Sequence, residues 1–74
     1  MSQAQVFETP IVASPNQAMS RLLISREKLY QLIKAGELES YTEGRSRRIM
    51  IESIDAYVKR RLEAEAARRR RKSS

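Results

Sequence analysis

The chain has 74 residues, contains neither cysteine nor histidine, and carries a formal charge of +6. These features exclude disulfides, thiolate or imidazole metal ligands and the most common general base of enzymes. No apolar run reaches the length of a membrane span or a signal-peptide core, which favours the cytoplasm. Because a pI of about 10.3 is typical of nucleic-acid-binding domains, we expect a polyanionic partner.

Residues 1–13 are expected to form an N-terminal arm outside the folded domain. Glu8 is the only charged side chain before residue 20, so the positive charge belongs to the rest of the chain. Pro10 interrupts the apolar stretch from Val6 to Val12, and proline removes a backbone hydrogen-bond donor. Two alternatives are open for the arm, a flexible segment or a strand packed on the domain.

A first helix is predicted to begin after Ser14. The run from Ser14 to Gln17 has the pattern of a capping box, with Pro15 at the first helical position. The helix should end near Leu22 or Leu23, and Ile24 then occupies a short turn.

A second amphipathic helix is predicted from Ser25 to Ala35. Ser25 is a suitable N-cap, and Gly36 is a suitable stop because the residue after a helix often takes positive φ. Three apolar residues follow helical spacing and form one stripe: Leu29, Leu32 and Ile33. Two short helices joined by a turn of a few residues, the second amphipathic, are typical of a helix-turn-helix.

A β-hairpin is predicted after the second helix. The segments 38–42 and 47–51 are β-prone, and a four-residue link, 43–46, contains Gly44. Ile49 and Ile51 alternate with Arg48 and Met50, so one face can pack while the other meets solvent. Arg48 is expected to brace the hairpin against Glu37 or Glu39.

A third helix is predicted from about Glu52. Its apolar stripe, expected to close the core, consists of Ile54, Tyr57, Val58 and Leu62. Five consecutive basic residues follow at 68–72, and like-charge blocks of this kind are usually disordered interaction tails. The predicted organisation is therefore an arm at 1–13, a folded domain at 14–66 and a basic tail at 67–74.

These elements resemble the excisionase family, small MerR-like winged helix-turn-helix proteins of mobile elements. The resemblance covers roughly residues 14–62. It is carried by the segments 22–26, 30–38, 44–45, 48–49 and 54–57, together with Tyr41. One departure is Leu23, at a turn position where the family usually has glycine. The resemblance implies an α+β fold with two short helices, a β-hairpin wing and a C-terminal helix, and it implies DNA binding.

The candidate DNA-binding residues form three groups. Such side chains suit phosphates and base edges, although on any one helix they could equally be a solvated polar face. The recognition-helix group is Ser25, Arg26, Glu27, Lys28, Tyr30, Gln31 and Lys34. The wing group is Thr42, Arg45, Ser46 and Arg47. The tail group, for DNA or a protein partner, is Arg68, Arg69, Arg70, Arg71 and Lys72.

Catalysis is not expected, because no nucleophile–base pair, phosphate-binding glycine loop or metal cluster can be assembled, and no cofactor or metal is implied. The resemblance implies a recombination directionality factor that binds double-stranded DNA cooperatively as several copies. It would bend the DNA and assist a tyrosine-type integrase during excision of a bacterial or phage-encoded element, in association with the nucleoid. A small transcriptional regulator at a promoter is the alternative, followed by a protein-interaction adaptor.

Overall fold

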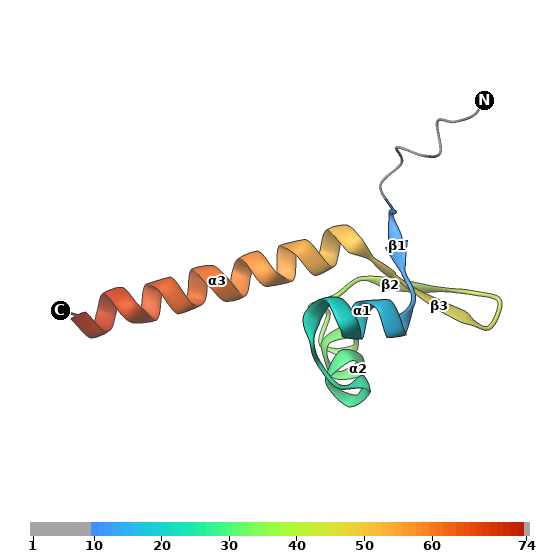
Figure 1. Ribbon diagram of the computed structural model, residues 1–74, viewed down its shortest axis with the longest axis horizontal. Coiled ribbons are helices and arrows are strands. Elements are labelled where there is room, and N and C mark those ends of the chain that lie inside the picture. The colour runs from blue at the N-terminus through green and yellow to red at the C-terminus, as the bar shows by residue number, and fades with distance from the viewer. Residues whose placement is uncertain (1–9, 74) are drawn as a thin grey trace, which may run out of the picture.

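Residues 10–73 are described by the computed structural model, with side chains through residue 71, and they form three helices and one three-stranded antiparallel sheet (Figure 1). This architecture confirms the predicted small winged helix-turn-helix. Residues 1–9 of the expected N-terminal arm lie outside the described part of the chain. The elements in chain order are β1 (Val12–Ala13), α1 (Pro15–Leu22), α2 (Arg26–Lys34), β2 (Ser40–Glu43), β3 (Ser46–Met50) and α3 (Ile51–Ser73).

The start of α1 is the predicted capping box. The Ser14 hydroxyl accepts from the Gln17 backbone N–H at 3.1 Å, and the Gln17 side-chain oxygen accepts from the Ser14 N–H at 2.9 Å. Two backbone donors without helical partners are thereby satisfied, with Pro15 at the first helical position. The predicted start of α1 and the predicted capping interactions are therefore both confirmed.

The turn between α1 and α2 depends on Leu23, which adopts the left-handed conformation (φ 55°, ψ 49°). Leucine keeps the backbone geometry that glycine usually provides at such a position, and α1 ends at Leu22 as predicted. The leucine side chain is 88% exposed. The family departure noted in the sequence thus changes the surface of the turn and leaves its backbone path intact.

Helix α2 begins and ends as predicted. The Ser25 hydroxyl accepts from the Lys28 N–H at 3.2 Å, and Gly36 follows the helix with a φ of 82°. The N–H groups of Glu37 and Leu38 donate to the Leu32 carbonyl at 2.9 and 3.3 Å. These bonds satisfy a helix-end carbonyl and direct the chain into the wing.

The wing is a hairpin with a shorter link than predicted. Strands β2 and β3 pair from Ser40 opposite Ile49 to Glu43 opposite Ser46, leaving only Gly44 and Arg45 between them. Gly44 has a φ of 61°, and glycine is favoured at the first position of such two-residue turns. The expected four-residue link at 43–46 was wrong, because Glu43 and Ser46 form the last strand pair.

The described end of the N-terminal arm contains a short strand packed on the domain, which was one of the two alternatives for this segment. Strand β1 pairs with β3, with Val12 opposite Met50 and Ala13 opposite Ile49. The Ile51 N–H also donates to the Ile11 carbonyl at 2.9 Å. Residues 12–13 therefore belong to the sheet, whose order is β1-β3-β2.

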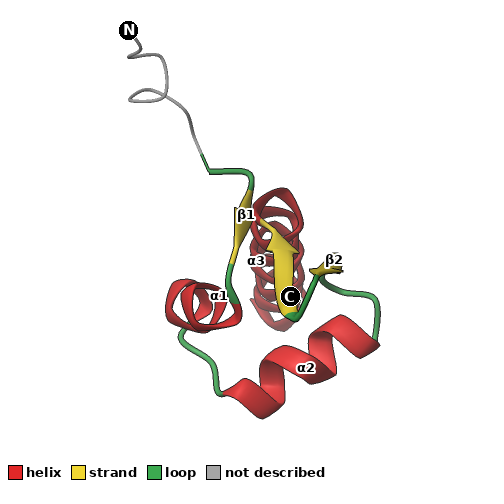
Figure 2. Cartoon of the chain, turned by 90° about the vertical axis from the view of Figure 1, so that its right-hand side faces the viewer, coloured by secondary structure: helices red, strands yellow, loops and turns green. Residues whose placement is uncertain are grey.

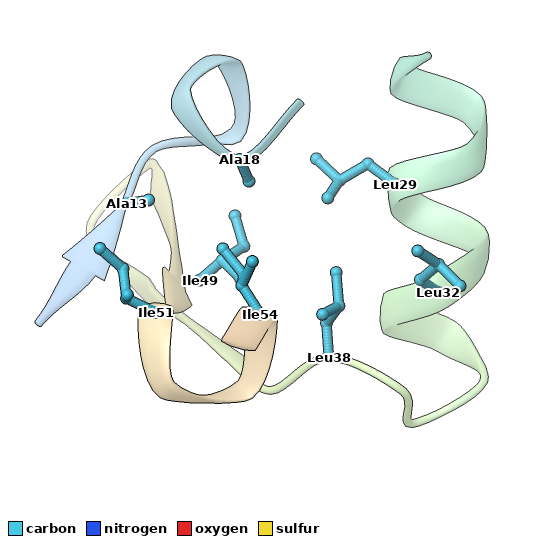
Figure 3. Close-up of a cluster of buried hydrophobic side chains, with 8 residues drawn as sticks. All are labelled: Ala13, Ala18, Leu29, Leu32, Leu38, Ile49, Ile51 and Ile54. Carbon is cyan, nitrogen blue, oxygen red and sulfur yellow. The ribbon is translucent and has the colours of Figure 1, made fainter. Parts of the chain in front are cut away.

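The core lies between the sheet, the two short helices and the first turn of α3. Figure 3 shows Leu29 of α2, Ile49 of β3 and Ile54 of α3 pointing toward a common centre. Leu29 and Ile49 have no exposed surface, and Ile54 is 2% exposed. Since the buried set also contains Ala13, Ala18, Leu32, Leu38 and Ile51, every element except β2 contributes to one small core.

Helix α3 is longer than predicted, and its outer part projects from this core (Figure 1). It continues through Ser73, so the expectation of a disordered tail at 68–72 was wrong. The alanines and straight-chain residues of 63–72 favour helix strongly enough to outweigh the like-charge block. Val58 and Leu62 are 40% and 63% exposed, so the predicted core stripe ends after Tyr57. Tyr57, Arg61 and Ala64 line a groove beside α2, so Val58 and Leu62 lie on a face of α3 that is turned away from α2.

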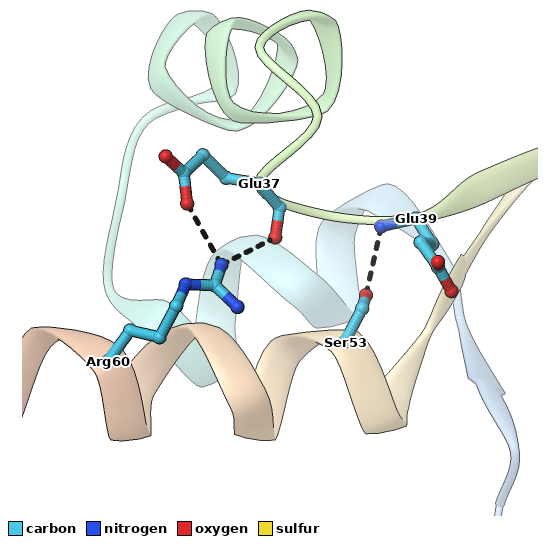
Figure 4. Close-up of polar contacts among 4 residues, drawn as sticks. All are labelled: Glu37, Glu39, Ser53 and Arg60. Carbon is cyan, nitrogen blue, oxygen red and sulfur yellow. Dashed lines mark hydrogen bonds and ion pairs between the residues drawn. The ribbon is translucent and has the colours of Figure 1, made fainter.

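Two polar contacts attach α3 to the chain between α2 and β2 (Figure 4). The Ser53 hydroxyl accepts from the Glu39 N–H at 3.0 Å and donates to the Met50 carbonyl at 2.7 Å. Arg60 donates to the Glu37 carboxylate at 2.8 Å and to its carbonyl oxygen at 3.1 Å. The guanidinium that reaches Glu37 is therefore that of Arg60, and the predicted bracing by Arg48 at this carboxylate was wrong.

Candidate nucleic-acid interface

The outer face of α2 presents the predicted polar side chains to solvent. Leu29 and Leu32 are buried on the inner face, and the 3.6-residue period therefore turns the intervening residues outward. Figure 2 shows α2 at the edge of the molecule, with α1 and α3 on its other side. The exposed residues of this group are Ser25, Arg26, Glu27, Lys28, Tyr30, Gln31 and Lys34.

Two of these residues have structural roles as well. The Ser25 hydroxyl is the N-cap of α2, and Arg26 donates to the Asn16 side-chain oxygen at 3.0 Å. Arg26 therefore links the start of α2 to α1 and holds the two helices of the motif together. Arg26 is an exposed residue, so this contact is compatible with an interaction at the protein surface.

A groove separates the wing from the two short helices. Tyr30 of α2 lines one side and the arginines of the wing line the other, while the capped start of α1 forms the end. All four predicted wing residues line it: Thr42, Arg45, Ser46 and Arg47. The structure thus brings the wing group and one recognition-helix residue to the same depression, which is basic and contains no acidic residue in its lining.

Arg47 is the most constrained cation of this groove. Its side chain follows Ile49 on the inner face of β3, where it donates to the Ser40 hydroxyl at 2.7 Å and lies 5.8 Å from the centre of the Tyr30 ring. Tyr30 is 37% exposed, so it occupies the edge between the core and the groove. Cation–π contacts of this kind orient the guanidinium without neutralising its charge.

A second groove lies between α2 and the projecting helix. It is lined by Lys28 and Leu32 of α2, by Glu37, and by the face of α3 that carries Tyr57, Arg61 and Ala64. Arg61 was absent from the predicted site residues. The helical spacing from Tyr57 to Arg61 and Ala64 is the signal that places it, once Tyr57 is known to face the domain.

The tail group is carried by α3 and begins four residues after Ala64, the last α3 residue that lines the second groove. Arg68 to Arg71 are exposed within the helix, and Arg68 pairs with Glu65 at 3.1 Å. The side chain of Lys72 lies beyond those that the structure describes.

The predicted wing site also omitted Arg48 and the start of α1, both of which line the first groove. Only the tertiary arrangement brings α1 next to the wing.

None of the helices within residues 10–73 has the length and hydrophobicity needed to cross a lipid bilayer.

Comparison with known proteins identifies the family of this chain. The model of a family described as the helix-turn-helix domain matches residues 14–62, and this family includes excisionase-like small DNA-binding proteins and is typically non-enzymatic. No curated protein and no solved structure matches the chain. The matched residues run from the cap of α1 through the wing to Leu62 in α3. The chain therefore belongs to the helix-turn-helix domain family and is a double-stranded DNA-binding protein.

Proposed function

We propose that this protein is an excisionase, a recombination directionality factor of a bacterial or phage element. It binds beside the attachment sites of that element, bends the DNA and promotes excision by a tyrosine-type integrase. The protein itself does no strand chemistry, and the integrase cuts and rejoins the strands. This proposal rests on the helix-turn-helix family and on the resemblance of the wing and closing helix to excisionases.

The observation that carries the proposal is the joint position of α2 and the wing. The exposed side chains Lys28, Gln31 and Lys34 suit the major groove, while Arg45 and Arg47 flank the adjacent depression. In this assignment α2 enters the major groove, and the wing lies along the neighbouring backbone or minor groove. Tyr30, Thr42 and Ser46 line the space between them.

The small size of the reading surface favours several copies at one site. A single small DNA-binding module typically buries roughly 600–1,000 Å² of protein surface, and high specificity usually needs more. The described residues expose 5973 Å² in total, of which the outer face of α2 and the wing are only a part. Cooperative binding to repeated sites supplies the missing specificity, and an array of bound copies also bends DNA.

An excision assay tests the proposal. Purified integrase and a plasmid carrying both attachment junctions are incubated with wild-type protein or with the variant K28A/Q31A/R45A. We expect the wild type to stimulate excision strongly and the variant to lose most of this stimulation. The double variant R21A/K59A, which removes two exposed positive charges outside the three candidate DNA-binding groups, should remain active. Absence of stimulation by wild-type protein bound to its sites would overturn the excisionase assignment.

Promoter occupancy is the second candidate function, because the same α2 and wing surface would occlude polymerase at an operator. A reporter fused to the neighbouring promoters distinguishes the two functions. Control of the promoter together with unchanged excision assigns the protein as a small transcriptional regulator.

A further inference from the structure

The projecting part of α3 has one face that continues the basic surface of α2. Tyr57 packs against the core, and Arg61 and Ala64 line the groove next to Lys28. In an α-helix, residues three and four positions apart share a face, so Arg68 and Arg71 extend the face of Tyr57, Arg61 and Ala64. We refer to Arg61, Arg68 and Arg71 of α3 as the arm face, which is distinct from the N-terminal arm at residues 1–13.

The charge on α3 is unequal around the helix. At 100° per residue, the arm face and the neighbouring Arg60 carry only positive charge. The opposite half mixes Lys59, Arg69 and Arg70 with the acidic residues Glu52, Asp55 and Glu63. Glu65 lies at the boundary, where it pairs with Arg68, whose side chain is still 70% exposed. Exposed pairs of this kind hold their partners weakly. The half of α3 that faces the α2 side is therefore the cationic one.

The three basic elements also have a definite order in space. Figure 1 shows the wing and α3 extending from opposite sides of the α1–α2 body, and Figure 2 shows α2 running across the direction of α3. A duplex that receives α2 in its major groove presents one phosphate backbone on each side of that groove. If α2 enters this groove, the wing extends on the side of one backbone and α3 on the side of the other.

We propose that the arm face is a second phosphate-binding surface, which holds the DNA backbone on the side of α2 opposite the wing. This inference rests on the proposed function, since it assumes that α2 enters the major groove. From Arg61 to Arg71 the helix rises about 15 Å, which matches about four base-pair steps of one strand. Guanidinium groups bind phosphate oxygens with paired hydrogen bonds, so their chemistry suits this ligand.

The arm face of α3 therefore enlarges the DNA footprint of a small domain without adding base contacts. Phosphate contacts position a protein on DNA and carry no sequence information of their own. The rigid helix places these contacts at a fixed distance from α2, whereas a disordered tail would spread them over many positions. The projecting part of α3 sets the orientation of each copy on the DNA and limits how closely the next copy can bind.

Two variants with equal charge change test this inference on the full chain. R61Q/R68Q/R71Q removes the arm face, and K59Q/R69Q/R70Q removes the same charge from the opposite half of α3. The inference thereby divides the tail group, because it assigns Arg68 and Arg71 to the phosphate contact and leaves Arg69 and Arg70 outside it. Glutamine keeps a similar helix propensity, so circular dichroism should show the same helix content and melting temperature for both. Affinity for a duplex with the cognate site is then measured by fluorescence anisotropy between 50 and 300 mM salt.

We expect the arm-face variant to bind at least about tenfold more weakly, and its log–log salt slope to be shallower by about 2 to 3, at about 0.9 for each lost phosphate contact. The opposite-half variant should retain affinity within about threefold, the residual loss being that of long-range electrostatics. Equal losses in the two variants would overturn the inference, because net charge rather than position would then explain the effect.

Hydroxyl-radical footprinting locates the contacts. Wild-type protein should protect the backbone on both flanks of the α2 site. R45Q should lose protection on the wing flank, and the arm-face variant should lose it on the other flank. Two outcomes contradict the inference while leaving DNA binding intact. One is an unchanged footprint of the arm-face variant. The other is normal DNA binding by the arm-face variant together with lost excision, which assigns the arm face to an acidic protein partner. Failure of wild-type protein to bind any duplex instead contradicts the proposed function.

Discussion

Arg47 and Tyr30 connect the wing to helix α2, with the Arg47 Cζ atom 5.8 Å from the centre of the Tyr30 ring. The two residues are far apart in sequence, and each lines the same groove. Arg47 also donates to the Ser40 hydroxyl at 2.7 Å, so its guanidinium is held from two directions. The contact fixes the position of a cation between two surfaces that we assign to DNA.

Replacing Tyr30 tests whether this orientation matters for binding. Tyr30→Ala removes the ring and should weaken DNA binding about three- to fivefold, the equivalent of about 0.7–1 kcal/mol from a lost cation–π contact. Tyr30→Phe keeps the ring and should bind within about twofold of wild type. Fluorescence anisotropy with the cognate duplex measures both. Tyr41→Ala, at a tyrosine of β2 that is 44% exposed, is the control. Equal losses for Phe and Ala would instead assign the Tyr30 hydroxyl to a phosphate contact.

Leu23 has a conformation that glycine adopts more readily. A left-handed backbone costs an ordinary residue about 1–2 kcal/mol, of which glycine's greater freedom in the unfolded chain offsets a part. Because the leucine side chain is 88% exposed, its removal loses little packing. We expect Leu23→Gly to stabilise the domain by about 1 kcal/mol and to raise Tm by about 4–8 °C.

Thermal unfolding followed by circular dichroism measures this change. Leu22→Gly is the matched control, because Leu22 is helical and packs against the core, and it should destabilise the protein. A lower Tm for Leu23→Gly would show that the exposed leucine makes a stabilising contact, for instance with a second copy.

Two leucines distinguish the real core from the predicted one. Leu29 is completely buried, whereas Leu62 is 63% exposed although its spacing predicted a core position. Leu29→Ala should cost about 2–5 kcal/mol, which is enough to unfold much of so small a domain. Leu62→Ala should change the free energy of unfolding by less than about 0.5 kcal/mol. Urea denaturation measures both, and a large cost for Leu62→Ala would mean that α3 is covered in solution.

Ser53 anchors the start of α3 to the segment before β2. Its hydroxyl has two backbone partners, the Met50 carbonyl and the Glu39 N–H. Ser53→Ala removes both bonds and should destabilise the domain by about 1–2 kcal/mol. Ser20→Ala, at an exposed serine of α1, should stay within about 0.5 kcal/mol of wild type. Urea denaturation followed by circular dichroism compares the two, and equal stability of the variants would exclude this anchoring role.

Much of the local structure could be predicted because its signals act over a few residues. The cap at Ser14, the cap at Ser25 and the positive φ of Gly36 each depend on immediate neighbours, and all three predictions are confirmed. The exposed face of α2 also follows from its period, since burial of Leu29 and Leu32 turns the intervening residues outward. The roles of these residues on DNA stay predictions.

Three of the wrong predictions concern the apolar stripe of α3, the tail at 68–72 and the arginine that pairs with Glu37. The predicted stripe on α3 continues through Val58 and Leu62, but the face of α3 that meets α2 carries Tyr57, Arg61 and Ala64 instead. The like-charge block at 68–72 predicted disorder, but the helix propensity of these residues outweighed the repulsion. Glu37 was available to several arginines, and the path of α3 brought Arg60 to it.

The sequence by itself therefore determined the boundaries of α1 and α2, the start of α3, the exposed polar face of α2 and the presence of a basic wing, because capping, glycine geometry and side-chain period are local properties. Only the tertiary structure decided that β1 joins the sheet, that Arg47 lies against Tyr30, and that α3 leaves the core with its basic face toward the side of α2. These features depend on which surfaces meet when segments far apart in the chain pack together, and no local pattern encodes that choice.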